Sequence, residues 1–382
     1  MELANQISQK QSDYCMECGV CTGSCPVSRE LPSFSPRQMI KRAMMDPDGG
    51  LLKSHELWAC LSCALCSSRC PVGIDFPEFI RSYREDARRE GNLPLESHHG
   101  ILQTITRFQT RGIRQKRTEW AEEAGAFRDK GDYFYFVGCL PYFDVTFQYL
   151  ELSPLESARS VLKILNKMGI EPVISNDERC CGHDALWSGD METFRKLAEI
   201  NLAVIKSSGA KTVFFSCPEG YFTFKHHYPK YFGDLPFEVL HMTEFLGQEL
   251  PNTDLTFRSS SDGTITYQDP CRLGRFSKNY ETPRQLLNLI PDIDFVEMER
   301  NRENALCCGT SAWMECSNCS KAIRLERLQE ALETGAKTLV TACPKCQIHF
   351  TCAQRNAELD LEVADIYAYL LKQLDEKSSQ KE

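Results

Sequence analysis

Two short cysteine runs near the start of the chain have identical spacing, and they limit what this sequence can fold around. Residues 15–26 read CMECGVCTGSCP and residues 60–71 read CLSCALCSSRCP. Each run places four cysteines as C-x2-C-x2-C-x3-C and closes with a proline. With this spacing, three thiolates can wrap one iron–sulfur cubane while the fourth ligates a second cubane. A zinc ribbon uses paired CxxC units with four cysteines per ion, which two proline-closed runs of this kind do not fit.

The fourth cysteine of each run is expected to cross to the cluster of the other run. The eight thiols then divide into two [4Fe–4S] sets, which are Cys15, Cys18, Cys21 and Cys70, and Cys25, Cys60, Cys63 and Cys66. The segment between the runs is longer than the short strands that join the runs of a compact ferredoxin. Helical spacing at 35–47, 51–60 and 75–92 predicts three helices, the last of which stops at Gly91. The first 90 residues are therefore expected to form a helical domain.

Further cysteines lie in the second half of the chain, in three groups. They are Cys271, the adjacent pair Cys307 and Cys308, and the CPKC pair Cys343 and Cys346. The strand-like runs TITYQ and TLVT end just before the first and the last group. Thiols that converge from distant turns at strand ends are what a buried multinuclear iron–sulfur centre needs. Inert core thiols are the alternative, because free cysteine is often buried, but burial explains neither the doubled CC before glycine nor the closing CPxC.

The same order of cysteines occurs once before in the chain. Cys139, the pair Cys180 and Cys181, and Cys217 precede their counterparts by 132, 127 and 126 residues. Alternating strand and helix patterns from Asp132 onward indicate largely parallel α/β units, so a duplication is expected over 132–255 and 262–375. The first copy closes with CPEG, which puts Gly220 where the fifth thiolate would be. Its four thiols are consistent with a cubane, with a modified centre and with a degenerate copy kept for its fold.

These patterns predict an α+β multidomain chain. The expected units are a helical ferredoxin domain over 1–90, a connecting arm over 91–131, two duplicated α/β cysteine-rich domains over 132–255 and 262–375, and a tail over 376–382. The polar, Ser-rich join PNTDLTFRSSSDG between the two copies has the composition of a linker.

With both halves considered, the chain resembles the heterodisulfide reductase family, in the arrangement that fuses its ferredoxin-bearing and cysteine-rich subunits into one polypeptide. The resemblance rests on the runs at 15–26 and 60–71 and on the two CCG motifs, and it covers nearly the whole chain. It implies that the second CCG domain binds a noncubane [4Fe–4S] cluster at which a disulfide is reduced. The catalytic residues that it implies are Cys271, Cys307, Cys308, Cys343 and Cys346.

The expected function is therefore that of an iron–sulfur oxidoreductase subunit that carries electrons through two cubanes to the five-cysteine cluster. The alternative is a non-catalytic relay in a large, electron-bifurcating anaerobic complex, such as one that contains class II benzoyl-coenzyme A reductase. The sequence has no GxGxxG at a strand–helix turn and no phosphate loop, so flavin or nicotinamide would have to sit on another subunit. The expected redox partner is a flavoprotein, a ferredoxin or a membrane cytochrome in a hetero-oligomeric complex.

The composition of the chain indicates its cellular compartment and excludes one class of partner. The chain has 20 cysteines in 382 residues, but it does not begin with the basic and apolar run of a signal peptide. No apolar stretch approaches the ~20 residues that a bilayer span needs. A cytoplasmic location is expected, with thiols committed to metal rather than to disulfides. The formal net charge of −9 argues against nucleic acid as the main partner.

A few residues near the motifs carry weaker signals. Cys316 and Cys319 form a CSNC near the start of a predicted helix, where a thiol pKa can be lowered. Packing is the favoured interpretation for them and for Cys352, because CxxC alone is a weak signal. Asp269 is expected to orient a cysteine ligand, and His183 is expected to pack.

Overall fold

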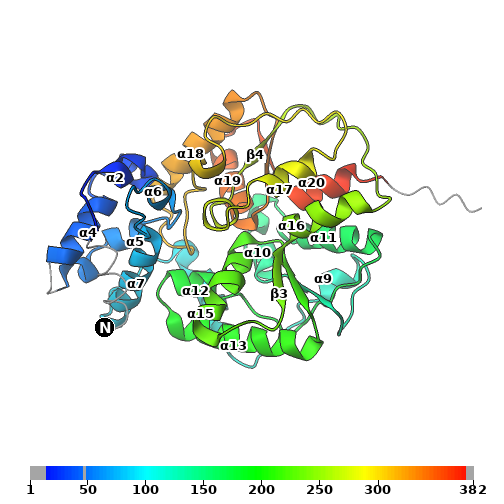
Figure 1. Ribbon diagram of the computed structural model, residues 1–382, viewed down its shortest axis with the longest axis horizontal. Helices are drawn as coiled ribbons and strands as arrows, with labels where there is room; N and C mark the ends of the chain where they lie inside the picture. The colour runs from blue at the N-terminus through cyan, green and yellow to red at the C-terminus, as the bar shows by residue number, and fades with distance from the viewer. Residues whose placement is uncertain (1–13, 46–48, 376–382) are drawn as a thin grey trace, which may run out of the picture.

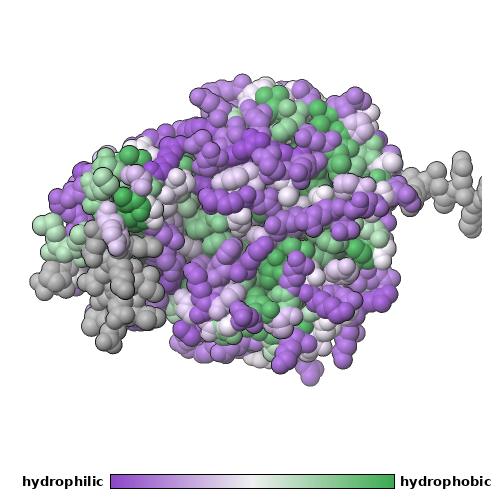
Figure 2. Space-filling model, in the orientation of Figure 1, coloured by the Kyte–Doolittle hydropathy of each residue, from purple (hydrophilic) through white to green (hydrophobic). Residues whose placement is uncertain are grey.

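The chain folds into a helical part and two α/β parts. The computed structural model describes residues 14–45 and 49–375; the predicted tail at 376–382 and residues 1–13 of the predicted helical domain lie outside this range. Figure 1 shows the helical part in blue on one side, with the two α/β parts beside it in green and in yellow to red. The combination of helices and two parallel sheets confirms the predicted fold class. Figure 2 shows hydrophobic residues exposed on the helical part at the left.

The N-terminal part consists of short helices that alternate with the cysteine loops. They are α2 (Val20–Ser24), α3 (Pro26–Glu30), α4 (Pro36–Met45), η1 (Gly50–Lys53), α5 (Glu56–Ala59), α6 (Leu65–Ser68) and α7 (Phe76–Arg89). Helix α7 begins where the Asp75 side chain accepts a hydrogen bond from the Glu78 amide at 3.2 Å. The single helix expected over 51–60 is two short helices, because Ser54 is extended and its hydroxyl donates to Glu56 at 2.7 Å.

Each α/β part contains a three-stranded parallel sheet. The strands are β1 (Tyr133–Phe136), β2 (Thr212–Phe215) and β3 (Glu238–His241) in the first part, and β4 (Ile265–Gln268), β5 (Thr338–Thr341) and β6 (Glu362–Asp365) in the second. The sequence analysis did not predict β3 or β6. The apolar segment EPVIS at 171–175 forms only isolated bridges through Val173, which follows Pro172, a residue without an amide to donate.

The two α/β parts pack against each other through equivalent helices. The first part has α10 (Leu140–Thr146), η3 (Gln148–Leu150), α11 (Leu155–Lys167), α12 (His183–Trp187), α13 (Met191–Ser208), α14 (Pro218–Phe222), η4 (Thr223–His227), α15 (Tyr228–Phe232), α16 (Met242–Glu249) and η5 (Leu250–Asn252). The second has η6 (Arg272–Phe276), α17 (Glu281–Leu287), η7 (Arg302–Asn304), α18 (Asn318–Glu333), α19 (Pro344–Asn356) and α20 (Ile366–Gln373). Helix α11 contacts α20 and α16 contacts α17 (Figure 1). By order along the chain, α17 corresponds to α11 and α20 to α16, so these two contacts are equivalent to each other.

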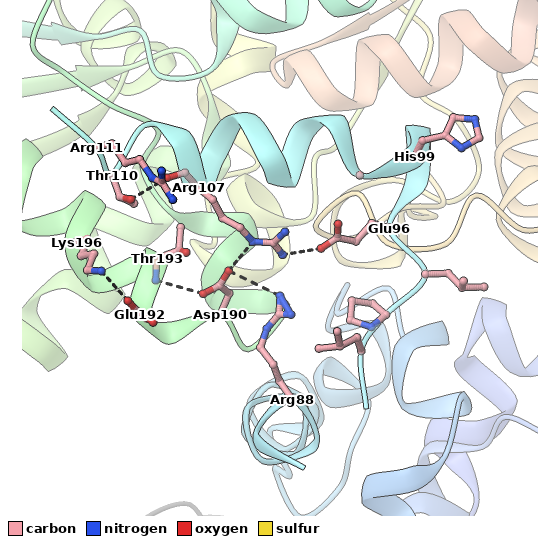
Figure 3. A pocket seen from close by; sticks show the side chains of 14 residues that line it. Arg88, Glu96, His99, Arg107, Thr110, Arg111, Asp190, Glu192, Thr193 and Lys196 are labelled. Atoms are coloured by element: carbon pink, nitrogen blue, oxygen red, sulfur yellow. Dashed lines mark hydrogen bonds and ion pairs between the residues drawn. The ribbon is translucent and has the colours of Figure 1, made fainter. Parts of the chain in front are cut away.

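The segment between the helical part and the first sheet packs against both neighbours. It contains η2 (Ser97–Gly100), α8 (Ile101–Phe108) and α9 (Glu119–Glu122). Figure 3 shows how Arg107 of α8 reaches Asp190, at 3.1 Å, and Glu96, at 2.7 Å, while Arg88 of α7 lies 3.7 Å from the same Asp190. On its other side, the Gln103 side chain donates to the carbonyl of Trp313 at 3.0 Å. The arm is therefore a packed element between the parts.

The contact between α7 and the first α/β part generates a test of how closely they are docked. A Cβ atom at Gly189 would lie 2.6 Å from the Arg84 carbonyl oxygen, whereas one at Gly209 would meet nothing within 4 Å. Both glycines have φ of 77°. Gly209→Ala should therefore cost only the left-handed strain of about 1–2 kcal/mol. Gly189→Ala should cost a further ~1–3 kcal/mol of overpacking.

Denaturant unfolding of the two variants side by side measures this difference. Equal losses of unfolding free energy in Gly189→Ala and Gly209→Ala would contradict the close approach of α7 to the first α/β part.

Candidate metal centres

The first cysteine set lies at the outer surface of the N-terminal part. Cys15, Cys18, Cys21 and Cys70, which come from both runs, line one small pocket beside α2 and α4. Cys18 is exposed, and the other three are partly buried. Cys66 also borders this pocket. The first set is therefore accessible from solvent on one side and adjoins the second set on the other.

The second set is buried where the N-terminal part meets the second α/β part. Each of Cys25, Cys60, Cys63 and Cys66 is only 7–8% exposed. Burial raises the pKa of the Cys25 thiol to about 12 and that of the Cys60 thiol to about 11. Charges on Cys63 and Cys60 also raise the pKa of Cys25, so this cysteine of the first run lies among thiols of the second. The structure thus brings together the two sets assigned from the sequence, while metal ligation by them stays a prediction.

Both cysteine loops hold their backbone in the left-handed region at matching positions. Glu17 and Ser62, each two residues after the first cysteine of a run, have φ of 50° and 44°. Gly19 and Ala64, each directly after the second cysteine, have φ of 79° and 61°. This conformation costs an L-residue roughly 1–2 kcal/mol, and it persists only where the surroundings enforce it. Loops bent in this way, with the Ser62 amide 3.3 Å from the Cys60 sulfur, fit the wrapping of a cluster.

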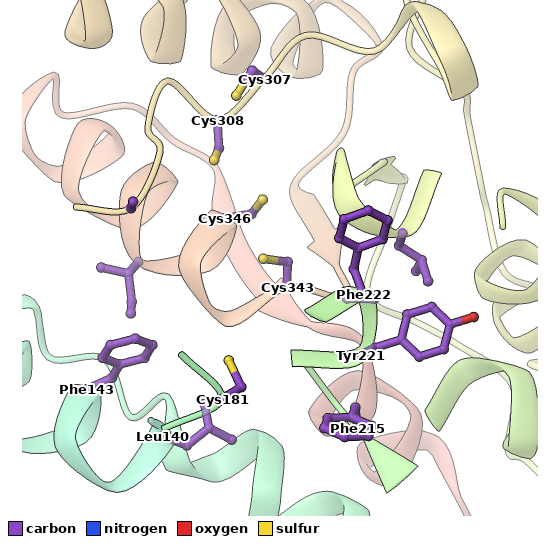
Figure 4. Close-up of a cluster of buried hydrophobic side chains, with 14 of the residues drawn as sticks. Leu140, Phe143, Cys181, Phe215, Tyr221, Phe222, Cys307, Cys308, Cys343 and Cys346 are labelled. Atoms are coloured by element: carbon purple, nitrogen blue, oxygen red, sulfur yellow. The ribbon is translucent and has the colours of Figure 1, made fainter. Parts of the chain in front are cut away.

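The thiols of the second α/β part gather at the carboxyl end of its sheet. Cys271 follows β4, Cys307 and Cys308 precede α18, Cys343 follows β5, and Cys346 lies in the first turn of α19. Figure 4 shows the sulfur atoms of Cys307, Cys308, Cys346 and Cys343 in a row, with Cys181 of the first part beyond them. Hydrogen bonds with the thiols of Cys307 and Cys346 hold the pKa of Cys308 well below its usual value. Sulfur atoms in such contact form one donor set of soft ligands.

The second ferredoxin set and this CCG set are in direct contact. Hydrogen bonding to the Cys307 thiol is the largest effect that lowers the pKa of Cys63 to about 6, and nearby Arg275 also lowers it. Beside these thiols, the hydroxyl oxygens of Ser62 and Ser311 are 2.6 Å apart. No protein layer therefore separates the cysteines of one predicted site from those of the next.

The first α/β part also brings its four cysteines to one pocket, but the pocket has a different lining. Cys139, Cys180, Cys181 and Cys217 border it together with His183, Asp184, Glu219, Phe215 and Lys345. A Cβ atom at Gly220 would lie 3.0 Å from Cδ1 of Phe215. The corresponding residue of the second part, two before its CPKC motif, is Thr341. The aromatic ring therefore crowds the place where a fifth cysteine would have to stand.

A buried ion cluster joins the two α/β parts at this pocket. Lys345 of the CPKC motif forms ion pairs with Asp184 and, at 2.6 Å, with Glu219 of the CPEG motif. His183 lies 3.0 Å from Asp184 and 3.3 Å from Glu219. Burial alone lowers the pKa of Lys345, but the two carboxylates raise it well above its usual value. His183, Asp184 and Glu219 are close enough to share a metal ion, but the lysine ammonium already supplies their counter-charge.

The sequence analysis missed this cluster, although a signal for it was present. Glu219 and Lys345 occupy the same position in the two closing motifs, two residues after the cysteine, and they carry opposite charges. Two copies that face each other across a pseudo-symmetric interface bring such positions together. His183, which was expected only to pack, also accepts a hydrogen bond from Nε of Arg272 at 3.0 Å.

The remaining residues singled out from the sequence are not part of the thiol sets described above. Asp269 receives two hydrogen bonds from the Arg284 guanidinium, at 2.8 and 2.9 Å, and its role in orienting a cysteine stays a prediction. Cys316 is exposed and Cys319 is partly buried at the start of α18. Cys352, on α19, is also partly buried.

Family models match the three parts of the chain. A 4Fe-4S dicluster domain matches residues 11–74, and a cysteine-rich domain, CCG, matches residues 133–225 and 265–351. These matches indicate iron–sulfur clusters. Among the described residues, none of the helices combines the length and apolar character of a bilayer span.

Known proteins are similar to this chain over most of its length. The chain is 29% identical over 392 residues to one subunit of the dihydromethanophenazine:CoB--CoM heterodisulfide reductase of Methanosarcina acetivorans, covering 95% of this chain and 94% of that protein. It is 26% identical over 374 residues to one subunit of the fumarate reductase (CoM/CoB) of Methanothermobacter marburgensis, covering 93% and 71%. A crystal structure of a hypothetical protein from Helicobacter pylori has a similar fold, with a TM-score of 0.51 at 13% identity over 90% of this chain and 67% of that one. The predicted resemblance to the heterodisulfide reductase family is confirmed.

The ion cluster predicts a large stability difference between two lysines. Lys345→Met keeps most of the side-chain volume but leaves Asp184 and Glu219, whose side chains are only 12% and 15% exposed, without their cation. It should therefore lower the free energy of unfolding by about 3–5 kcal/mol. Lys337, which pairs with Asp360 at 2.9 Å on the surface, is the matched control. Lys337→Met should cost less than about 1 kcal/mol.

Chemical unfolding of the iron-loaded protein under anaerobic conditions measures both losses of unfolding free energy. A Lys345→Met variant as stable as the Lys337→Met control would show that the ion cluster around Lys345 does not hold the two α/β parts together.

Proposed function

We propose that this chain, which belongs to the family of fused ferredoxin and CCG-domain proteins similar to heterodisulfide reductase, is an electron-transfer oxidoreductase subunit. Its electrons would pass from two [4Fe–4S] sites in the N-terminal domain to the five-cysteine site of the second CCG domain, where a disulfide is reduced. The observation that carries the proposal is the contact between Cys63 of the ferredoxin domain and Cys307 of the CCG domain.

The donor sets suit the clusters that the proposal requires. Thiolates are the soft ligands that iron–sulfur clusters take. Cys15, Cys18, Cys21 and Cys70 would hold the first cubane, Cys25, Cys60, Cys63 and Cys66 the second, and Cys271, Cys307, Cys308, Cys343 and Cys346 the noncubane cluster. Bound there, the clusters would supply one-electron transfer over short distances. The chain itself holds the ligands, keeps water from the inner two sets and fixes the spacing between them.

The exposure of the three sets supports a direction for this path. Cys18 of the first set is exposed, the second set is buried, and the CCG set adjoins the second. Large apolar side chains lie exposed around the first set, with Tyr14 and Met16 about 70% and 69% exposed. Met45, on α4, is 71% exposed. An apolar rim around a shallow cluster suits a redox partner such as a flavoprotein, a ferredoxin or a membrane cytochrome, so we propose that electrons enter here.

The first CCG domain has a different part in the proposal. Phe215 crowds the fifth-ligand position, and Lys345 fills the acidic side of the pocket. We therefore propose that this domain does not carry a second five-thiolate centre and that it serves to hold the other sites in place. Three filled sites correspond to about twelve iron atoms per chain, and a cubane on the four remaining thiols would bring the number to about sixteen.

The second candidate function is an electron relay without a disulfide substrate. It is favoured by the deep burial of the CCG thiols, of which Cys307, Cys343 and Cys346 are only 2–4% exposed. Both functions share the path from the first set to the CCG site, and they differ in whether a thiol or a disulfide can react at its end.

Replacing single ferredoxin cysteines tests the crossed ligation. Cys25→Ser should remove the signal of the cluster shared with Cys60, Cys63 and Cys66, because the fourth cysteine of a run serves the other cluster. Cys70→Ser, the matched control in the other run, should instead remove the signal of the cluster shared with Cys15, Cys18 and Cys21. Iron analysis and electron paramagnetic resonance (EPR) of the reduced proteins distinguish them. If Cys25→Ser and Cys18→Ser abolish the same signal, the assignment is wrong.

Titration of the anaerobic protein with thiols and disulfides tests the reaction at the CCG site. Cys346→Ala should abolish the thiol-responsive EPR signal and spare both ferredoxin clusters, because it removes the thiolate that only the second CCG domain has. Cys217→Ala, in the first domain, should leave that signal intact. If the unmodified protein holds about twelve iron atoms but its EPR signals do not respond to thiols or disulfides, it functions as a relay. A response that survives Cys346→Ala and disappears in Cys217→Ala would assign the chemistry to the first domain.

A further inference from the structure

Two arginines that follow Cys271 are buried between the ferredoxin domain and the second CCG site. Arg272 is 3% exposed and Arg275 is 4% exposed. Nη1 of Arg272 donates to the carbonyl oxygen of Ser62 at 2.9 Å, and Nε of Arg275 donates to that of Cys63 at 2.6 Å. Both guanidinium groups therefore lie against the loop that carries the second cysteine set.

Neither of these buried charges has a carboxylate partner among the described residues. Other buried arginines, such as Arg117 and Arg284, form ion pairs with an acidic side chain at 3.2 and 2.8 Å. Arg272 instead packs against the rings of Trp187 and Phe276, whose centroids are 4.0 and 4.2 Å from its guanidinium carbon. An uncompensated buried cation is costly, so these two arginines need another source of negative charge.

Arg275 contacts the backbone of both neighbouring sites. Besides the carbonyl oxygen of Cys63, its guanidinium donates at 2.5 Å to that of Ala305, two residues before Cys307. Its Nη2 atom is buried and has no hydrogen-bond partner among the described residues. Cys63 belongs to the second ferredoxin set, while Cys271 and Cys307 belong to the CCG set. The missing counter-charge therefore corresponds to the place where two thiolate-ligated clusters, each of net negative charge, would meet.

We propose that Arg275, supported by Arg272, is the shared counter-charge of these two sites and raises the reduction potential of the cluster held by Cys25, Cys60, Cys63 and Cys66 above that of the first cluster. This inference rests on the proposed function, because it requires both clusters to be present. A fixed positive charge in a poorly screened interior favours the more negative, reduced state of a neighbouring cluster.

The first set lacks a comparable pair of buried cations among the described residues. Arg37 borders its pocket, but it is partly exposed at the surface, where water and salt screen its charge. Electrons that arrive at the first set would thus move toward the higher potential of the second. The cation that creates this difference comes from the CCG domain, so the ferredoxin domain acquires its gradient only when the two domains are docked.

The experiment is an anaerobic redox titration of the iron-loaded protein, followed by EPR. In the unmodified protein, the signal lost in Cys63→Ser should have the higher midpoint potential, and the signal lost in Cys18→Ser the lower one. Arg275→Gln should shift the ratio of reduced to oxidised second cluster at least tenfold toward oxidised, which is about 59 mV for a one-electron couple. In Arg275→Lys, the midpoint potential of the second cluster should stay close to that of the unmodified protein. The midpoint potential of the first cluster should be the same in both variants as in the unmodified protein.

Arg69→Gln is the matched control, because Arg69 bridges the same two domains to Asn304 at 2.7 Å from an exposed position. The Arg69→Gln variant should leave the midpoint potential of the second cluster unchanged. Unchanged potentials in an iron-replete Arg275→Gln variant overturn the inference and leave the proposed function standing. A second cluster of lower potential than the first in the unmodified protein also overturns it, even where the arginine variants do not fold. If anaerobically purified protein contained no iron, both this inference and the proposed function would be overturned.

Discussion

A cysteine loop that wraps a cluster cannot also be a regular helix or strand, and the carbonyl groups that this leaves unpaired must still find donors when the loop is buried. The loop around Cys60 and Cys63 meets this constraint with arginines from two domains. Arg84 of α7 donates to the carbonyls of Leu57 and Cys60, at 3.1 and 2.6 Å. The carbonyls of Ser62 and Cys63 receive hydrogen bonds from the CCG domain. The hydrogen bonds of this loop are therefore complete only in the assembled chain, which couples the geometry of one site to the docking of the next.

The duplicated domains show how a symmetric interface can hold unequal sites. The pairs α11 with α20 and α16 with α17 repeat the same contact on both sides of the pseudo-two-fold axis. At the closing motifs the symmetry is broken by charge, because Glu219 and Lys345 occupy equivalent positions and bind each other. Two CPKC motifs facing each other would bring two lysines together. The absence of a fifth cysteine in the first copy is therefore compatible with a charge pair between the copies. The closing motif of the first domain has Gly220 in place of a cysteine, and its Glu219 binds the second domain through Lys345.

The sequence could predict the features that follow from local patterns. Cysteine spacing indicated the composition of each thiol set, and the helix expected over 75–92 forms as α7, Phe76–Arg89. All six strands in the described part of the chain have four residues, but β3 and β6 begin with an exposed glutamate and have a partly exposed third residue. They therefore lack the continuous buried run that marks β1, β2, β4 and β5. The ion pair of Lys345 with Glu219 and the contact of Cys63 with Cys307 depend on how distant segments meet. No periodicity in one segment of the chain specifies such contacts.

The connecting arm gives a physical reason for having these sites in one polypeptide. A flexible linker would raise the effective concentration of one domain near another but would leave the distance between their sites variable. Here Gln103 of α8 binds the backbone at Trp313, close to the CCG loop, and Arg107 joins Asp190 at the start of α13. The arm thus spans the two CCG domains and contacts α7 through the same Asp190. It acts as a strut that fixes the spacing of the thiol sets, so the distance between them is a property of the fold.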